Sequence, residues 1–166
     1  MKDTLKESSK FDIKKSINRA RGKNKAIARW RIKISDAEVE WSNITERIAL
    51  IRKGVPFESI EVISKQADLS VKQMLSILGI PQTTYNKKKR DNDTLNGRDS
   101  EVVLLLTELL DMGVIVFNHE EKIFQRWLRK PNPSLGGVKP ESLFDSISGI
   151  QEIKNSLNRL EYGNMA

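Results

Sequence analysis

Residues 70–90 read SVKQMLSILGIPQTTYNKKKR and carry the signals of two short helices joined by a sharp turn. Ser70 is a favoured N-cap residue, and Gln73 three positions later completes a capping box, so a helix is expected to begin there. Gly79 permits an abrupt bend, and Pro81 suits the start of a second helix, because the first helical position tolerates a missing N–H. The stretch therefore predicts a helix-turn-helix.

The second of these helices, residues 82–90, is polar and basic and has little to bury against a core. Its amide and hydroxyl side chains suit base edges in a major groove, while its run of cations suits phosphates, since consecutive residues point around a helix. The free N–H groups at the starts of both helices could also accept a phosphate. The predicted DNA-binding residues are Ser70, Gln82, Thr83, Thr84, Asn86, Lys87, Lys88 and Arg90. The alternative is a helix-turn-helix scaffold that no longer binds DNA.

Apolar residues at helical spacing continue on both sides of this motif. Ser35 or Asp36 is expected to cap a helix that runs to about Lys53, and a second helix is expected over residues 57–67. The expected inner face of the first helix consists of Trp41, Ile44, Ile48 and Ile51.

A long helix is expected from Asp99 or Ser100 to about Phe117, and it is apolar round most of its circumference. Such a helix either lies at the centre of the fold or also faces a second subunit. A homodimer would pair two helix-turn-helix units about a two-fold axis and so match palindromic DNA. A single self-contained core is the alternative.

The positive charge of the chain is concentrated at its N-terminus. Residues 1–34, the basic arm, hold 12 Lys and Arg residues against three acids, a net charge of +9 in a chain whose total is +7. Such an arm is typical of nucleic-acid binding, because neutralised phosphates release their counterions. It could instead be a solubilising tail. Its apolar residues leave open whether part of it is helical, packs on the body or becomes ordered only on DNA.

Residues 127–137 read WLRKPNPSLGG and predict a stiff turn after a short amphipathic helix. The prolines at 131 and 133 fix their own backbone angles and restrict the residues before them, and the glycines at 136 and 137 reach angles closed to other residues. One helix later the chain reads RLEYG at residues 159–163. The turn is either an ordinary inter-helix loop or a contact surface, and the tyrosine is either a packed cap or an interface anchor.

Together, the tryptophan–leucine pair, the PNP-x-LGG turn and the R-x-EYG ending resemble the C-terminal domain of the Xre/MbcA/ParS antitoxins, the partners of RES-domain toxins in bacterial type II toxin–antitoxin systems. The resembling pattern occupies residues 124–163, and the likeness extends over about residues 37–163. It implies an all-α fold, with an Xre-like helix-turn-helix domain followed by a small α-helical toxin-binding domain. The basic arm is longer than the family leads us to expect.

With this resemblance we expect three regions: the basic arm, which departs from the family, a DNA-binding and dimerisation domain over residues 35–118, and a toxin-binding domain over residues 119–166. RES toxins resemble NAD-degrading enzymes, and the turn and the chain end would obstruct the toxin's nucleotide pocket. The residues expected at the toxin are Arg129, Pro131, Asn132, Leu135, Gly136, Gly137, Glu161, Tyr162 and Gly163.

Composition argues against several other classes of protein. The sequence has no cysteine and one histidine, His119, so we expect no disulfide, metal site or cofactor. It carries no glycine-rich phosphate loop or nucleophile motif, and we expect no enzymatic activity. Charged residues interrupt its longest apolar stretch, and the N-terminus lacks a signal-peptide core, so we expect no membrane contact and a bacterial cytoplasmic location.

The sequence thus favours an antitoxin that occludes a RES-type toxin and represses its own operon, as a homodimer and within a hetero-oligomeric toxin–antitoxin complex. A stand-alone helix-turn-helix regulator with a C-terminal dimerisation domain is the alternative. A scaffold that binds neither DNA nor toxin is a third.

Overall fold

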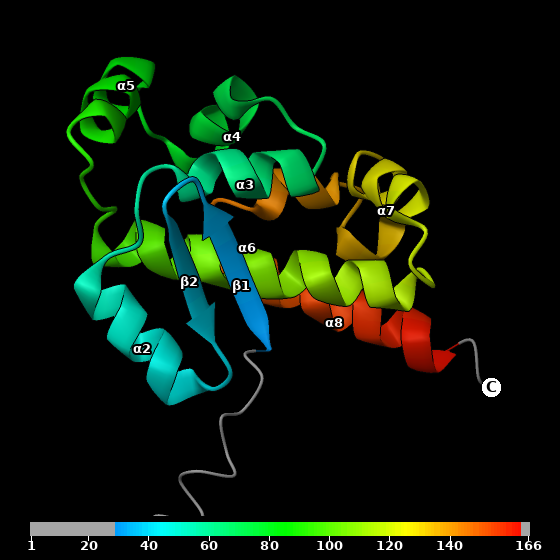
Figure 1. The fold of residues 1–166 in the computed structure, drawn as a ribbon. Coiled ribbons are helices and arrows are strands. Elements are labelled where there is room, and N and C mark those ends of the chain that lie inside the picture. Colours follow the sequence, from blue (N-terminus) through cyan, green and yellow to red (C-terminus); the bar gives the residue numbers. More distant parts are fainter. Residues whose placement is uncertain (1–28, 164–166) are drawn as a thin grey trace, which may run out of the picture.

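The computed structural model describes residues 29–163 and confirms the mainly helical fold expected from the sequence (Figure 1). The expectations for residues 1–28 of the basic arm lie outside the described residues. The elements, in chain order, are β1 (Trp30–Ile34), β2 (Ala37–Trp41), α2 (Ile44–Lys53), α3 (Ser59–Gln66), α4 (Val71–Leu78), α5 (Gln82–Arg90), α6 (Gly97–Val116), α7 (Glu121–Leu128), the short 3-10 helices η1 (Pro133–Leu135) and η2 (Pro140–Leu143), and α8 (Ile147–Gly163).

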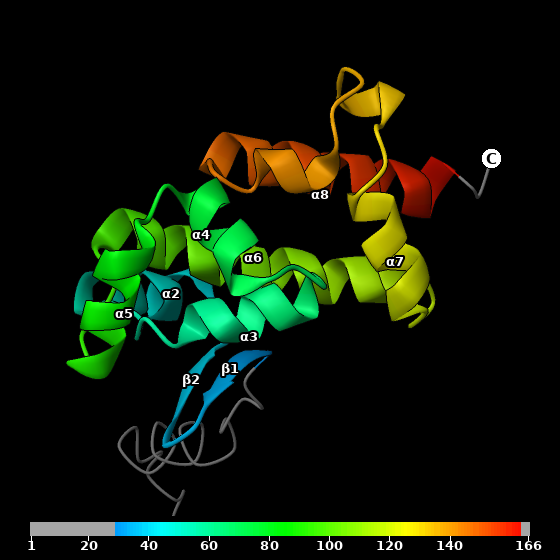
Figure 2. The same ribbon diagram turned by 90° about the horizontal axis from the view of Figure 1, so that it is seen from above.

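Helix α6 is the central element on which the others pack. It spans 20 residues, and 12 of them are buried, including Leu104, Leu106 and Leu109. Helix α8 lies along α6, while α2, α3 and the β-hairpin cover other parts of it (Figures 1 and 2). Burial within one chain is therefore enough to explain the apolar circumference of α6, and it does not by itself require a second subunit.

The helix expected from Ser35 or Asp36 is wrong in its first part, where the chain forms a β-hairpin. Strands β1 and β2 pair antiparallel, with Ile34 opposite Ala37, so Ser35 and Asp36 form the turn. Ile32 and Trp41 are buried. The physical reason is the strict alternation of apolar and charged residues in WRIKI and AEVEW, a period of two that favours a strand over a helix.

Helix α2 begins only at Ile44, where Asn43 accepts a hydrogen bond from the Glu46 N–H and caps it. None of its residues is buried, and Ile44 and Ile48 are 62% and 39% exposed. The expected inner face is thus wrong for Ile44 and Ile48, whereas Ile51 is partly buried against the core. The hairpin also covers this side of α6, and its tryptophan at position 41 is buried in a strand.

The expected helix over residues 57–67 is confirmed as α3, with Ile60 and Ile63 fully buried. None of the helices between residues 29 and 163 combines the length and apolar character that crossing a membrane requires.

A buried carboxylate at the middle of α6 joins elements from both ends of the chain. Glu108 is 6% exposed and accepts hydrogen bonds from Trp41 Nε1 at 2.9 Å and Arg47 at 2.6 Å through one oxygen. Its other oxygen accepts from Lys154 Nζ of α8 at 3.1 Å. The hairpin, α2 and α8 are therefore held to α6 by one residue, and the buried charge is compensated by two cations.

We expect Glu108→Gln to lower the free energy of unfolding by about 3 kcal/mol, because Arg47 and Lys154 would lose their counter-charge in a largely buried place. Chemical denaturation monitored by circular dichroism measures this. Glu152→Gln is the matched control, since Glu152 pairs with Arg159 on the surface and should change stability little. Equal stabilities of the two variants would contradict the role given to Glu108.

The same site predicts a pH dependence. Burial opposes ionisation of Glu108, but the hydrogen bonds from Trp41 and Arg47 and the charge of Lys154 outweigh it and hold the pKa of Glu108 below its ordinary value of 4.5. The unfolded chain therefore binds the proton more tightly, and this contribution to stability is present above pH 4.5 and lost as the pH falls below it. The Glu108→Gln variant should lose less stability over that acid range than the parent.

Candidate functional site

The helix-turn-helix forms where the sequence predicts it, as α4 and α5. Ser70 caps α4 by accepting from the Gln73 N–H at 3.2 Å, and the Gln73 side chain accepts from the Ser70 N–H at 2.9 Å. Gly79 ends α4 at a φ of 72°, in the left-handed region that glycine occupies without strain. Pro81 then sits at the N-cap of α5. Local sequence signals thus set both helix boundaries.

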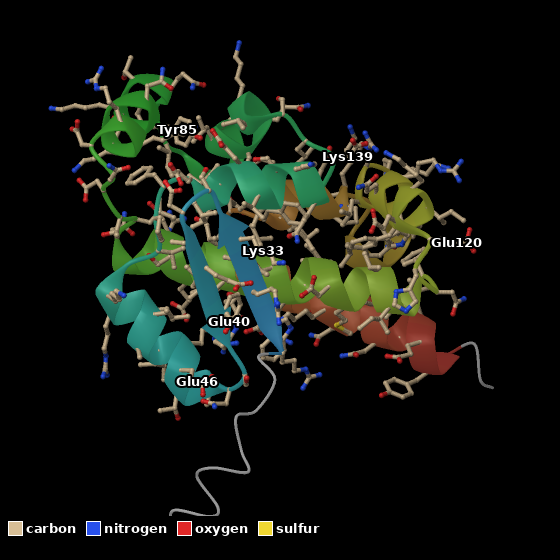
Figure 3. All side chains as sticks on the ribbon, in the orientation of Figure 1. Lys33, Glu40, Glu46, Tyr85, Glu120 and Lys139 are labelled. Carbon is tan, nitrogen blue, oxygen red and sulfur yellow. The ribbon has the colours of Figure 1, made fainter. Side chains whose placement is uncertain are left out.

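Helix α5 packs on the core through one buried residue, Tyr85, that the sequence pattern did not single out. Tyr85, labelled in Figure 3, is its only buried residue. Its ring lies 6.4 Å from that of Phe57, and its hydroxyl donates to Glu61 of α3 at 2.9 Å. Burial and Glu61 raise the pKa of Tyr85, so it remains a neutral hydrogen-bond donor. A lone aromatic residue in a polar helix was the available signal for this anchor.

The anchor leaves one face of α5 open to solvent. The predicted DNA-binding residues Gln82, Thr83, Thr84 and Asn86 are all exposed. Gln82 donates to Asn86 at 3.1 Å, which places their amides side by side one helical turn apart. Ser70 is exposed at the start of α4. The structure therefore presents the predicted residues on the surface.

The cations of α5 divide into two kinds. Lys88 pairs with Asp93 at 2.5 Å, which holds the pKa of Lys88 above its ordinary value, and Lys89 pairs with Glu61. Lys87 and Arg90 are more exposed, and Arg90 has only a distant contact of 3.9 Å with Asp91. Phosphate binding by Lys88 would compete with its acidic neighbour, whereas Lys87 and Arg90 face less competition.

The second candidate surface is the proline–glycine turn, residues 131–137, which is cross-linked by its own hydrogen bonds. The Asn132 side chain accepts from the N–H of Ser134 at 2.9 Å and from its hydroxyl at 2.8 Å. The Asn132 N–H donates to the Val138 carbonyl, and the Gly137 N–H donates to the Asn132 carbonyl, each at 2.9 Å. Gly136 adopts a φ of 73°. The turn is rigid because both its side chains and its backbone close it.

Leu135 fixes this turn to the body. It is 9% exposed, so most of its side chain packs in the core. The hydroxyls of Ser134 and Ser156 share a hydrogen bond of 2.9 Å that joins the turn to α8. Pro131, Gly136 and Gly137 remain exposed.

The predicted residues at the end of α8 lie on the surface. Tyr162 is 70% exposed, and Glu161 and Gly163 are exposed beside it. An aromatic side chain with so little cover within its own chain has area to bury against a partner. The packed-cap alternative for Tyr162 is therefore not what the structure shows.

Arg129, predicted at the toxin, is engaged within the chain. Its guanidinium donates to Asp68 at 2.6 Å, on the turn that precedes α4, and its Nε donates to the Gln125 carbonyl. The Gln125 side chain donates to the Gln66 carbonyl at 3.1 Å. These hydrogen bonds join α7 to the segment that leads into the helix-turn-helix. Local sequence patterns did not predict this contact, because the residues lie far apart in the chain.

An aromatic cluster holds α7 against the end of α6. The rings of Phe117, Phe124 and Trp127 lie 5.6–6.2 Å apart. A Cβ on Gly113 would stand 2.0 Å from the Phe124 ring, so this close approach requires glycine.

A cavity of about 720 Å³ lies between the start of β1, the second half of α6 and α8, with Trp30, Asp111 and Ile115 among its lining residues. Burial raises the pKa of Asp111 there. Among residues 29–163 no group of three or more histidine or carboxylate side chains is placed to hold a metal ion.

The fold and its exposed surfaces define a helix-turn-helix protein with a small helical domain attached to its C-terminal side. Residues 46–108 match the antitoxin Xre-like helix-turn-helix domain, and residues 112–163 match the antitoxin Xre/MbcA/ParS C-terminal toxin-binding domain. The chain belongs to the Xre/MbcA/ParS family of antitoxins.

Named relatives agree with this assignment. The chain is 31% identical over 129 residues to the Prs ADP-ribosylating antitoxin of a Sphingobium species, covering 73% of this chain and 81% of the relative. It is 25% identical over 115 residues to antitoxin Xre of Photorhabdus laumondii, covering 69% and 78%. It is 24% identical over 113 residues to antitoxin Xre of Yersinia enterocolitica, covering 68% and 76%.

We expect Asn132→Ala to loosen the proline–glycine turn and to lower the free energy of unfolding by roughly 1 kcal/mol, since the Ser134 N–H and hydroxyl lose their acceptor. Hydrogen exchange at the Ser134 amide should accelerate. Asn158→Ala, at an exposed position of α8, is the control and should change neither quantity. Unchanged exchange at Ser134 would show that the turn is held by its backbone alone.

Proposed function

We propose that this antitoxin neutralises a RES-domain toxin by blocking access to the toxin's nucleotide pocket. The observation that carries the proposal is the rigid, exposed proline–glycine turn within the toxin-binding domain. A preformed projection loses little conformational entropy when it enters a cleft. The antitoxin itself performs no chemistry in this mechanism.

The predicted contacts have different roles in this proposal. Pro131, Gly136 and Gly137 form the exposed surface of the projection, and Asn132 and Leu135 hold its shape from within. Glu161, Tyr162 and Gly163 add a second contact at the end of α8, with Tyr162 as the aromatic anchor. Arg129 supports the base of the turn through Asp68.

The toxin that fits this role consumes NAD. The Sphingobium relative is named a Prs ADP-ribosylating antitoxin. NAD degradation and ADP-ribosylation both start from NAD, so occlusion of a nucleotide pocket would inhibit either kind of toxin.

We also propose that the helix-turn-helix represses the antitoxin's own operon in the bacterial cytoplasm. Helix α5 presents amides and hydroxyls suited to base edges, with Lys87 and Arg90 placed for phosphates. Helix α5 packs on α3 through Tyr85, and its opposite face is left open to a DNA groove. A homodimer would present two such helices to a palindromic operator, and a hetero-oligomeric complex with toxin would carry both activities.

The second candidate function is a stand-alone regulator whose C-terminal domain only dimerises. The exposure of Ile123, Val138 and Ile147 in the C-terminal domain gives such a protein apolar surface for self-association. This candidate binds operator DNA and leaves an NAD-consuming toxin unrestrained.

Co-expression with the cognate RES-domain toxin tests the first proposal. The parent antitoxin should co-purify with the toxin and maintain cellular NAD, and Tyr162→Ala should weaken capture by about tenfold or more, since interface aromatics often contribute over 1 kcal/mol. Helicity and operator binding of the variant should remain unchanged, because Tyr162 is 70% exposed. A parent that neither captures toxin nor preserves NAD would eliminate this function, whereas full protection by the variant would remove only the anchor.

Operator binding at several salt concentrations tests the second proposal. The double variant Lys87→Ala/Arg90→Ala should weaken binding and reduce the slope of log K against log salt by about 0.9 for each phosphate that is no longer neutralised. Lys88→Ala/Lys89→Ala removes the same charge from the same helix but from residues already paired with Asp93 and Glu61. Its slope should change less. Equal slopes for the two variants and the parent would show that α5 does not hold phosphates through these side chains.

A further inference from the structure

A groove separates the two surfaces that we assign to toxin binding. This groove, the turn groove, has a volume of about 580 Å³ and is lined by residues 130–134 on one side and by Ser156, Arg159 and Leu160 of α8 on the other, together with Trp127. It lies directly beside the proline–glycine turn and one residue before Glu161. A partner that contacts both the turn and the end of α8 must therefore lie across it.

The turn groove is preformed. Its walls are joined by the hydrogen bond between Ser134 and Ser156, and Leu135 anchors the turn in the core beneath it. Two prolines stiffen one wall and a regular helix forms the other. A ligand could enter without first ordering the site, which reduces the cost of binding.

A mixed polar and apolar hollow, with Asn118 and Glu120 in its lining, adjoins the groove. This hollow has a volume of about 270 Å³, shares Trp127 and Leu160 with the turn groove and extends past Phe117 and the partly exposed Ile123. Trp127 packs on Phe117 and Phe124, so it is held in place by the aromatic cluster. The turn groove therefore supplies the apolar part of this surface, between Trp127 and Leu160.

The charge of the turn groove is one-sided. Lys130 and Arg159 line it, and none of its lining residues is acidic. Arg159 contacts Glu152 at 3.2 Å on the surface, which leaves its half-exposed guanidinium able to bind a second carboxylate. The larger cavity beside β1 differs, because Glu108, Asp111, Glu121 and Glu161 line it. The turn groove is thus suited to an apolar ligand that carries a carboxylate.

We propose that the turn groove receives a segment of the toxin, with an apolar side chain between Trp127 and Leu160 and an adjacent carboxylate held by Lys130 and Arg159. This inference rests on the proposed antitoxin function and deepens it. Binding is then reciprocal: the proline–glycine turn enters the toxin while the toxin fills the groove beside that turn. The cognate toxin would then be selected in two ways: by the charge of the cations in the groove and by the shape of the proline–glycine turn beside it.

The antitoxin's own basic arm is a poor occupant. Residues 1–28 of the arm hold nine Lys and Arg residues against three acids, and this positive charge would meet two cations and no acid in the groove. A second antitoxin copy is the other candidate occupant, and the oligomeric state of the free protein distinguishes it from the toxin.

The test compares two charge-reversal variants of the full-length antitoxin for affinity toward the cognate RES-domain toxin. Lys130→Glu/Arg159→Glu reverses both groove cations, and Lys122→Glu/Lys139→Glu reverses two exposed lysines of the same domain that do not line the groove (Figure 3 shows Lys139). We expect the groove variant to bind toxin at least about tenfold more weakly and with a flatter salt dependence than the control. Thermal unfolding of both variants verifies that each is folded.

A photo-reactive phenylalanine analogue at position 160 supplies a second readout that does not depend on loss of affinity. It should cross-link to a toxin peptide that contains an apolar residue beside Asp or Glu. Equal toxin affinities of the two reversal variants, or a cross-linked peptide without an acid, would overturn the groove assignment. The proposed antitoxin function would still stand in that case, as long as the parent captures the toxin. A groove variant that changes only the mass of the free antitoxin in sedimentation would assign the groove to a second copy and also overturn it. Failure of the parent to capture toxin would remove both proposals.

Discussion

The buried charge of Glu108 is the constraint on which the arrangement of this antitoxin depends. A carboxylate in the middle of a central helix is costly unless hydrogen bonds and counter-charges surround it. Here Trp41, Arg47 and Lys154 fill that requirement, and they come from the hairpin, α2 and α8. Each of these elements is therefore fixed relative to α6 by the need to compensate one charge. Apolar packing alone would allow more than one arrangement of the hairpin and α8 along so uniformly apolar a helix.

Helix α6 and the elements packed on it hold the proposed DNA-binding surface and the proposed toxin-binding surface apart, at fixed positions relative to each other. Helix α5 and helix α7 lie toward opposite ends of α6 in both views (Figures 1 and 2). The contact between Arg129 and Asp68 adds a direct tie from the base of the proline–glycine turn to the start of α4. A toxin held at the turn would consequently be held at a defined position relative to the operator. Under the proposed functions, this geometry would let DNA and toxin bind the same chain without either ligand occupying the other's surface.

The parts that the sequence predicted well are those that local chemistry controls. Ser70, Gly79 and Pro81 act on neighbouring residues, so the boundaries of α4 and α5 followed from their order along the chain. The hairpin was missed because Ser35 and Asp36 are as suitable for a helix cap as for a turn, and the alternation of WRIKI and AEVEW was the stronger signal. The pairing of Lys88 and Lys89 with acids and the engagement of Arg129 required the tertiary structure, since their partners lie 5, 28 and 61 positions away. The turn groove, too, exists only because the turn folds back on α8.

Hydrogen exchange of the antitoxin alone, on operator DNA and in complex with toxin is the most direct measurement of whether the two surfaces are separate. We expect DNA to slow exchange in α4 and α5 and toxin to slow exchange in residues 129–137 and 156–163, with no segment protected by both. Protection of α5 by the toxin, or of the proline–glycine turn by DNA, would contradict the division of the molecule into a DNA-binding end and a toxin-blocking end.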